Sequence, residues 1–147
     1  MATYSFEQVF ATLTGAAGVI SLGAGSANAK EGITITKSQT RNTMTIGADG
    51  AVMHSLKADK SGTVTVRLLE TSPVNSLLQA MLNAQALSPT AWGNNVLVVV
   101  NKGSGETTTC RNVAFQGEPE IVYSEEGQVR EWMFDCGKID TLRGDYA

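Results

Sequence analysis

The chain of 147 residues has a formal net charge of −3 and a sequence pI of 5.1. A chain of this length buries about two-thirds of the surface exposed in its unfolded form, so we expect a single domain over residues 1–147 without a disulfide or metal staple. Nucleic-acid-binding proteins need clustered Lys and Arg to displace counterions from phosphates. Here the basic residues are scattered, with Lys57 and Lys60 the nearest approach to a cluster, which disfavours tight DNA or RNA binding.

The composition favours β-structure. Charged residues make up 17% of the chain, below the roughly 25% of an average soluble domain. Thr, Ser, Gly and Asn take their place. Thr and Val favour pleated strands because branching at Cβ restricts their rotamers in a helix, and 15 glycines against three prolines indicate many turns.

The N-terminal part predicts a strand followed by an irregular loop. Residues 4–13 alternate in character, which places Tyr4, Phe6 and Phe10 on one strongly apolar face. Residues 15–30 are rich in Gly, Ala and Ser, a composition typical of a loop.

The same stretch imitates a signal peptide, because residues 9–20 are fairly apolar and residues 27–29 have the small side chains of a cleavage site. A signal peptide begins with a basic segment, whereas the first Lys of this chain is Lys30, so we expect no signal peptide. No run reaches the roughly 18 apolar residues of a membrane span, so we also expect no membrane partner.

The middle of the chain predicts a projecting β-hairpin over residues 43–56, after a short strand at residues 33–36. Asp49 and Gly50 separate its two arms, and glycine supplies the positive φ that tight hairpin turns require. Because the arms are followed by polar residues 57–61, the hairpin is expected to project from the body.

The clearest strand, at residues 62–69, precedes the one convincing helix, at about residues 73–86. Ser72 is a favourable N-cap and Pro73 suits the first helical position. An apolar stripe of period 3.6 supports the helix, and its members are Val74, Leu77, Leu78, Met81 and Leu82.

The C-terminal half predicts further strands. Residues 95–100 are almost wholly apolar and are expected to be buried on both faces, whereas residues 106–115 alternate. Residues 120–124 and 128–136 are expected to form two more strands, and residues 138–147 a frayed tail or arm. About eight short strands with one inserted helix indicate a mainly β sandwich or barrel.

The sequence offers little material for catalysis or cofactor binding. His54 is the single histidine, and together with Cys110 and Cys136 it falls short of the four ligands of a structural zinc site. No Ser or Cys nucleophile stands at a family-like spacing from His54. We therefore expect no enzyme activity, no cofactor and no metal. The two cysteines are either buried thiols or a disulfide.

Several blocks of the chain resemble a family of structural proteins, the tail tube proteins of contractile-tailed bacteriophages. The central block is NTMTIGADG at residues 42–50, continued by VMHSL at residues 52–56 and SGTVTVRLL at residues 61–69. TSPVN at residues 71–75 belongs to the same pattern, as do YSFE at the start of the chain and WGNNV before the apolar strand. The resemblance covers nearly the whole chain.

This resemblance implies a fold of two packed antiparallel sheets with one flanking helix. It implies that six subunits form a ring whose strands join around a channel, and that rings stack into a tube inside a contractile sheath. The predicted hairpin would then reach from one ring to the next. Its expected inter-ring contact residues are Met44, Ile46, Asp49, Met53 and His54.

The partners implied by the resemblance are further copies of the chain, the tail sheath protein, baseplate or initiator proteins and the tail terminator. The tape measure protein and phage DNA would occupy the lumen transiently. The implied location is the virion tail, assembled in the host cytoplasm.

The channel is expected to be lined by the strand at residues 128–136, where Glu131 and Asp135 face away from the aromatic side. Acidic side chains would repel DNA phosphates and let the genome slide. Arg130, on the aromatic face, does not fit this pattern. Four further glutamates form either a solvated loop or another acidic lining: Glu118, Glu120, Glu125 and Glu126.

Two other functions remain open. The chain could be another tail component of the same fold, such as a terminator or baseplate-hub tube protein, or the tube of a phage-derived injection particle. It could also be a monomeric β-sandwich binding module, which would need exposed aromatic side chains. Only Trp92 and Trp132 are candidates for that role.

Overall fold

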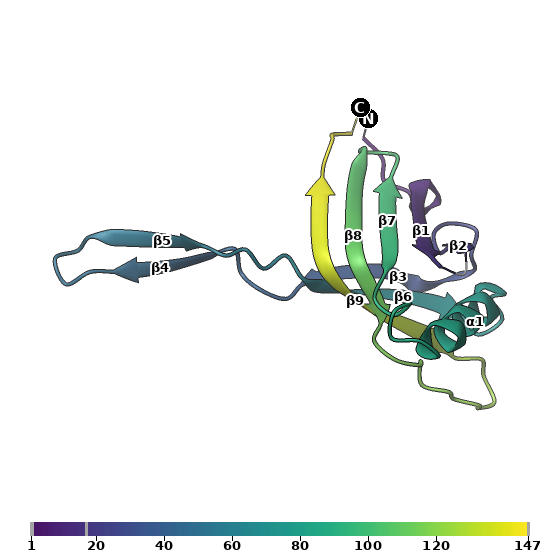
Figure 1. The fold of residues 1–147 in the computed structure, drawn as a ribbon. Helices are drawn as coiled ribbons and strands as arrows, with labels where there is room; N and C mark the ends of the chain where they lie inside the picture. The colour runs from purple at the N-terminus through teal and green to yellow at the C-terminus, as the bar shows by residue number, and fades with distance from the viewer. Residues whose placement is uncertain (1, 17, 147) are drawn as a thin grey trace.

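The computed structural model describes residues 2–16 and 18–146 of the chain. Within these residues the fold consists of nine strands, one α-helix and one short 3-10 helix (Figure 1). The elements in chain order are η1 (Phe6–Gln8), β1 (Val9–Gly15), β2 (Gly18–Ser21), β3 (Asn28–Lys37), β4 (Asn42–Ile46), β5 (Val52–Leu56), β6 (Gly62–Leu69), α1 (Val74–Ala86), β7 (Asn95–Asn101), β8 (Glu106–Phe115) and β9 (Val129–Leu142). The mainly β prediction with one helix is confirmed.

Seven of the strands form one antiparallel sheet in the order β2-β1-β7-β8-β9-β6-β3. The sheet curls so that its two halves face each other, and α1 lies at the side where they diverge (Figure 1). Strand β9 joins the halves, because its first part pairs with β6 and its last part pairs with β8. The two predicted layers are therefore parts of one continuous sheet.

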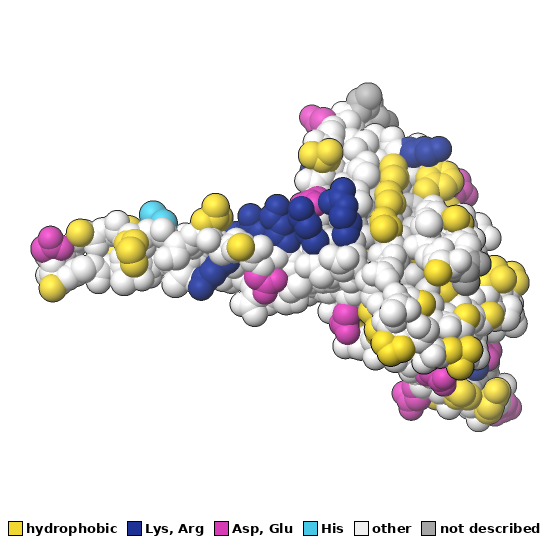
Figure 2. Space-filling view, in the orientation of Figure 1, with side chains coloured by type: hydrophobic (Ala, Val, Ile, Leu, Met, Phe, Trp, Pro, Cys, Tyr) yellow, Lys and Arg dark blue, Asp and Glu magenta, His cyan; other side chains and the backbone are white. Residues whose placement is uncertain are grey.

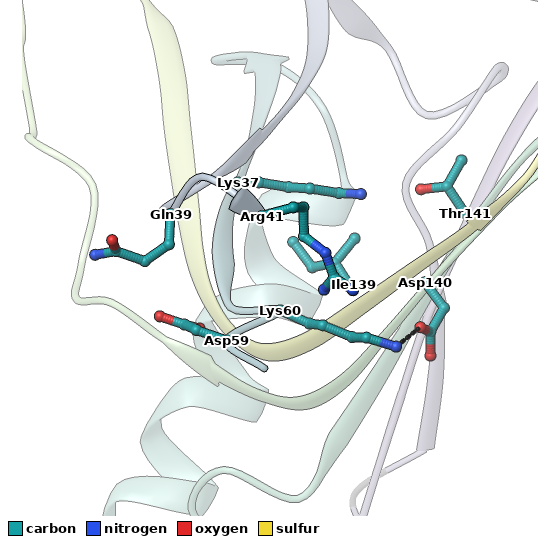
Figure 3. Close-up of a pocket in the computed structure, with 8 residues that line it drawn as sticks. All are labelled: Lys37, Gln39, Arg41, Asp59, Lys60, Ile139, Asp140 and Thr141. Atoms are coloured by element: carbon teal, nitrogen blue, oxygen red, sulfur yellow. Dashed lines mark hydrogen bonds and ion pairs between the residues drawn. The ribbon is translucent and has the colours of Figure 1, made fainter. Parts of the chain in front are cut away.

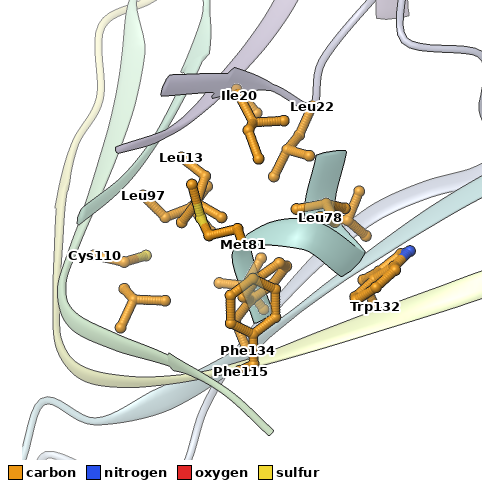
Figure 4. Close-up of a cluster of buried hydrophobic side chains, with 14 of the residues drawn as sticks. Leu13, Ile20, Leu22, Leu78, Met81, Leu97, Cys110, Phe115, Trp132 and Phe134 are labelled. Atoms are coloured by element: carbon orange, nitrogen blue, oxygen red, sulfur yellow. The ribbon is translucent and has the colours of Figure 1, made fainter. Parts of the chain in front are cut away.

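The core lies between the two halves of the sheet and α1. Phe115 contacts Phe134 and Trp132 with ring centroids 5.1 and 6.1 Å apart. The helix adds Leu78 and Met81 to the same cluster, and all of these side chains are buried (Figure 4). Burial of each large apolar side chain stabilises the fold by about 1.5–3 kcal/mol relative to leaving it exposed.

The buried face of the first strand differs from the prediction. Val9, Ala11 and Leu13 are buried, whereas Phe10 is 40% exposed and packs under the Lys102 ammonium at 4.4 Å. The reason is that residues 6–8 form a 3-10 turn, so the alternation begins only at Val9. Tyr4, before the turn, and Phe6, within it, therefore do not set the inward face of β1.

Three boundaries in the sheet also differ from the sequence prediction. Part of the expected loop at residues 15–30 forms the short strand β2, which pairs with β1. Residues 120–124 form no strand and lie in an extended loop between β8 and β9. Strand β9 continues to Leu142 because Ile139 is buried in the core, so the first half of the expected tail belongs to the sheet.

Strand β7 is buried on one face rather than on both. Leu97 is fully buried, whereas Val96, on the opposite face, is 36% exposed and Val98 and Val100 are half-buried. Periodicity alone could not show this, since an all-apolar run looks the same whether its second face meets the core or a partner.

The helix forms as predicted and is fixed at its start by Ser72. The Ser72 Oγ accepts a hydrogen bond from the Val74 amide at 3.3 Å and donates one to the Ser26 carbonyl at 2.6 Å. On its buried face, Gln85 forms two hydrogen bonds with Asn95, of 2.7 and 2.9 Å, which join α1 to β7. Leu77, expected in the apolar stripe, is instead exposed.

Candidate functional site

The β4–β5 hairpin projects far from the body of the molecule (Figure 1). Its strands pair only with each other, from Asn42 opposite Leu56 to Ile46 opposite Val52. At the tip, Gly50 adopts a φ of 86°, and the Asp49 carboxylate accepts a hydrogen bond from the Ala51 amide at 3.0 Å. The projecting hairpin of the sequence prediction is confirmed.

Apolar side chains of the hairpin are exposed on both of its faces. One face carries three cross-strand pairs, in which Met44 lies opposite His54 and Ile46 opposite Val52. The other face carries Met53 opposite a threonine. Five large apolar side chains are 54–80% exposed: Met44, Ile46, Val52, Met53 and Leu56.

The five hairpin residues predicted as contacts are therefore distributed over three surfaces. Met44, Ile46 and His54 share one face, Met53 lies on the other, and Asp49 stands at the tip with a local role in the turn. The Nδ1 atom of His54 lies 3.2 Å from the side-chain amide nitrogen of Asn42, a contact between the two strands of the hairpin. The hairpin thus exposes apolar side chains on both of its faces.

The root of the hairpin is a hollow lined by polar and charged side chains (Figure 3). Asp140 of β9 lies at its side and forms ion pairs with Lys60 at 3.4 Å, Arg111 at 2.9 Å and Lys138 at 3.8 Å. Partial burial raises the pKa of Asp140, but Lys138, Lys60 and Arg111 together hold that pKa below its usual value. One carboxylate is thus surrounded by three cations.

Glu131 and Asp135, predicted to line a channel, lie on the outer face of the β6–β9 half of the sheet. The Glu131 carboxylate is 3.4 Å from the Arg67 guanidinium, and Arg67 also donates a hydrogen bond to the Thr34 hydroxyl at 2.8 Å. Asp135 pairs across the strands with Thr63 and forms no ion pair within the described residues. The face also carries threonines and Met133, and Glu131 lines a hollow together with Glu118 and Glu120.

Arg130, which did not fit the strand pattern, makes a structural ion pair. Its guanidinium donates two hydrogen bonds to the Glu70 carboxylate, at 2.7 and 2.9 Å, and holds the pKa of Glu70 below its usual value. The next inward side chain, Trp132, donates from Nε1 to the Asn75 amide oxygen at 3.0 Å. These contacts fasten β9 to β6 and α1, a role that strand alternation does not reveal.

The remaining candidates do not assemble into a reactive site. Cys110 and Cys136 are free and buried, and the pKa of Cys136 is raised by its hydrogen bond to Cys110 and by burial. In residues 2–16 and 18–146, no group of three or more His, Cys, Asp or Glu side chains is arranged to hold a metal ion. Among the helices that the structure describes, none has the length and apolar character needed to cross a membrane.

The fold is similar to those of several solved structures of contractile injection particles. A chain of the cryo-EM structure of the anti-feeding prophage cap (AFP tube terminating cap) matches with a TM-score of 0.59 and 11% identity, covering 98% of this chain and 95% of that chain. A chain of the PVC sheath/tube terminator in the extended state, from an extracellular contractile injection system, matches with a TM-score of 0.60 and 14% identity, covering 97% and 98%. The PVC sheath-tube complex gives a TM-score of 0.59 at 10% identity, covering 96% and 92%.

At these identities the likeness concerns the fold. A search of the curated proteins gives no match. The family model described as bacteriophage PhiTE tail tube protein matches residues 1–144, which is nearly the whole chain. The chain therefore belongs to this family of phage tail tube proteins.

Proposed function

We propose that this chain is the structural subunit of a phage tail tube, and that its single domain assembles into six-membered rings that stack into a hollow tube inside a contractile sheath. The observation that carries the proposal is the projecting hairpin with five exposed apolar side chains. An isolated two-stranded hairpin is at best marginally stable in water. Contact with the next ring would bury these side chains.

The two apolar faces of the hairpin suit insertion between two surfaces better than lying flat on one. Met44, Ile46 and His54 would contact one surface of the next ring and Met53 the other. Asp49 would hold the shape of the leading tip through its hydrogen bond to Ala51. These residues form the proposed inter-ring contact.

Ring closure has a second support in the sheet itself. The outer strands β2 and β3 pair on one side only. Unpaired strand edges are an aggregation hazard unless a partner covers them, and head-to-tail contacts that close on themselves make rings. Six copies joined through these edges would satisfy the free backbone groups.

The outer face of the β6–β9 half is the proposed wall of the lumen. DNA would be ejected through this lumen. Asp135 and Glu131 supply negative charge, and the neighbouring threonines are small and polar. Arg67 partly neutralises Glu131, so Asp135 would carry most of the repulsion toward phosphates. A weakly acidic, threonine-lined wall would let DNA pass without holding it.

The remaining partners follow from the same assignment. They would be the sheath protein outside the tube, the baseplate or initiator and the terminator at its ends, and the tape measure protein inside it. The complex would assemble in the host cytoplasm and remain in the virion. As a structural subunit the chain would have no enzymatic activity and no cofactor.

The second candidate is a terminator or the tube of a phage-derived injection particle, which the fold likeness to a tube terminating cap and a tube terminator favours. A monomeric binding module is less well supported, because Trp132 is 1% exposed and Trp92 packs against Phe115 with ring centroids 6.4 Å apart. Trp92 is 37% exposed, so a single tryptophan is left for an aromatic binding face.

Negative-stain electron microscopy with mass determination by light scattering tests the proposal. Rings with a central hole and a mass of about six subunits, stacked into tubes at higher concentration, are the expected result. Rings that never stack would favour the terminator. A 15.5 kDa monomer at every concentration would contradict the proposal.

A further inference from the structure

The hairpin root and the far end of the molecule carry opposite charge. Six of the 11 Lys and Arg residues surround the root. Figure 2 shows a blue band of Lys and Arg side chains where the hairpin leaves the body. We call this surface the basic root; only Asp59 and Asp140 interrupt it. Its members are Lys37, Arg41, Lys57, Lys60, Arg111 and Lys138.

Half of the basic root is without an ion-pair partner among the described residues. Lys60, Arg111 and Lys138 share the carboxylate of Asp140. The other three cations are exposed and form no ion pair within the described part of the chain: Lys37, Arg41 and Lys57.

The loop between β8 and β9, residues 116–128, has the opposite charge. It contains four glutamates and no Lys or Arg, and we call it the acidic loop. Glu118 accepts a hydrogen bond from Gln79, while the other three are exposed and form no ion pair among the described residues: Glu120, Glu125 and Glu126. Ile121 and Tyr123, between them, are 55% and 86% exposed.

The two surfaces lie at opposite ends of the body. Strand β6 begins at Gly62, beside the hairpin root, and ends at Leu69, where the Glu70 amide bonds the Gln128 carbonyl at 3.2 Å. At about 3.3 Å per residue this strand separates the two surfaces by about 25 Å. That separation exceeds the Debye length of about 8 Å at physiological salt, so within one molecule the two surfaces barely attract each other.

We infer that the basic root of one copy docks on the acidic loop of the next copy. This inference rests on the proposed function and names the surface that receives the hairpin. The hairpin of one copy would reach into the next ring. Its root would then approach the neighbouring copy at the end opposite to that copy's own hairpin. The loop between β8 and β9 lies at that end (Figure 1), and its exposed Ile121 and Tyr123 would add apolar area to the contact.

The charge pattern also sets the polarity of stacking. In a back-to-back pair of rings the same end of each ring would meet, which would bring basic roots toward basic roots or acidic loops toward acidic loops, and like charges at an interface oppose association. Head-to-tail stacking brings opposite charges together at every step. The same two surfaces therefore select a polar tube over a closed, back-to-back pair of rings.

Reciprocal charge reversal in the full-length protein tests this pairing. The first variant carries Lys37→Glu, Arg41→Glu and Lys57→Glu, and the second carries Glu120→Lys, Glu125→Lys and Glu126→Lys. No ion pair described within the molecule involves these six residues, so both variants should keep the wild-type melting temperature. The measured quantity is the lowest protein concentration that gives tubes, read by light scattering and electron microscopy.

Each variant alone should raise that concentration by roughly tenfold or more, because like charges then face each other across the interface. Combining all six substitutions should restore it to within about threefold of wild type, as the attraction is rebuilt with reversed sign. The matched control reverses three cations outside the basic root: Lys30, Lys102 and Arg143. Added to the acidic-loop variant, this control should give no rescue.

The outcomes separate the inference from the proposed function. If either charge-reversal variant forms tubes at the wild-type concentration, or if the combined variant does not recover, the pairing is overturned. The proposal that the chain is a tube subunit would still stand. Rescue by the control would show that net charge, and not this contact, decides assembly. A wild-type protein that never forms rings or tubes would overturn both proposals.

Discussion

The body and the hairpin of this chain are built on opposite principles. In the body, alternate residues of a curled sheet converge on a dry core closed by α1, and Val64, Val66 and Leu68 of one strand are all fully buried. In the hairpin, the same alternation of a β-strand buries almost nothing, and nine of the ten strand residues are exposed. The body holds its fold by internal packing, whereas the hairpin leaves its apolar side chains exposed, as the proposed inter-ring contact requires.

Removing the hairpin is the most severe test of this division. Residues 43–56 can be replaced by two glycines, because the Lys57 amide and the Arg41 carbonyl already lie 2.8 Å apart at its base. The melting temperature should stay within a few degrees of wild type, since the hairpin contributes nothing to the core. Electron microscopy should show rings but no tubes. A shortened chain that still stacks would remove the hairpin from the inter-ring contact.

Single truncations in the two regions should differ sharply in their cost. Phe134→Ala should lower the free energy of unfolding by about 3–5 kcal/mol, because the ring is fully buried against Phe115 and leaves a cavity. Ile46→Ala, at a 54% exposed position, should change it by less than about 0.5 kcal/mol. Chemical denaturation measures both values.

The matched readout for these two variants is tube formation. Ile46→Ala should weaken stacking although the subunit is fully stable. Phe134→Ala should fail to form tubes only under conditions in which the subunit unfolds. Equal effects on unfolding would show that the hairpin packs on the body in solution.

A smaller effect is expected at the buried amide pair that joins α1 to β7. Asn95→Leu removes both hydrogen bonds to Gln85, whose side chain is 2% exposed and would be left without a partner. The cost should be about 1–3 kcal/mol. The double variant Gln85→Leu/Asn95→Leu should recover part of it, because no buried polar group is then left unsatisfied. A double variant as unstable as the sum of both single variants would argue against this explanation.

The sequence revealed those parts of the molecule where local pattern and environment agree. The alternation of β6, the start of α1 next to Ser72 and Pro73, and the Asp49–Gly50 turn depend on contacts within a few residues, and each agrees with the sequence prediction to within a residue. The predicted inner face of β1 was wrong, because Phe10 is more apolar than Ala11 but lies outside the core. Hydrophobicity cannot distinguish a core face from a face that meets another subunit.

The charged surfaces show a different limit. Lys37 of β3, Arg111 of β8 and Lys138 of β9 are far apart in the sequence, and the pairing of strands in the curled sheet brings them to the hairpin root. Arg130 looked like a defect in a strand until its partner Glu70, 60 residues away, was in place. Long-range pairing of this kind leaves no period in the sequence, so it could not have been predicted.

The Arg130–Glu70 pair supplies the prediction with the smallest expected effect. Arg130 holds the pKa of Glu70 below its ordinary value of 4.5, so the folded state favours the carboxylate more than the unfolded state does. The stabilisation is therefore complete above pH 4.5 and is lost as the pH falls through the lowered folded pKa.

Glu70→Gln should accordingly lower the melting temperature slightly at neutral pH, and the difference from wild type should shrink in acid. The control is Glu31→Gln, at an exposed carboxylate with no ion pair among the described residues, which should run parallel to wild type. Because this pair fastens β9 to β6 inside one subunit, tubes of Glu70→Gln should form at the wild-type concentration. A change in the concentration needed for tubes, without a change in melting temperature, would show that the Arg130–Glu70 pair contributes to assembly and not to the stability of the body.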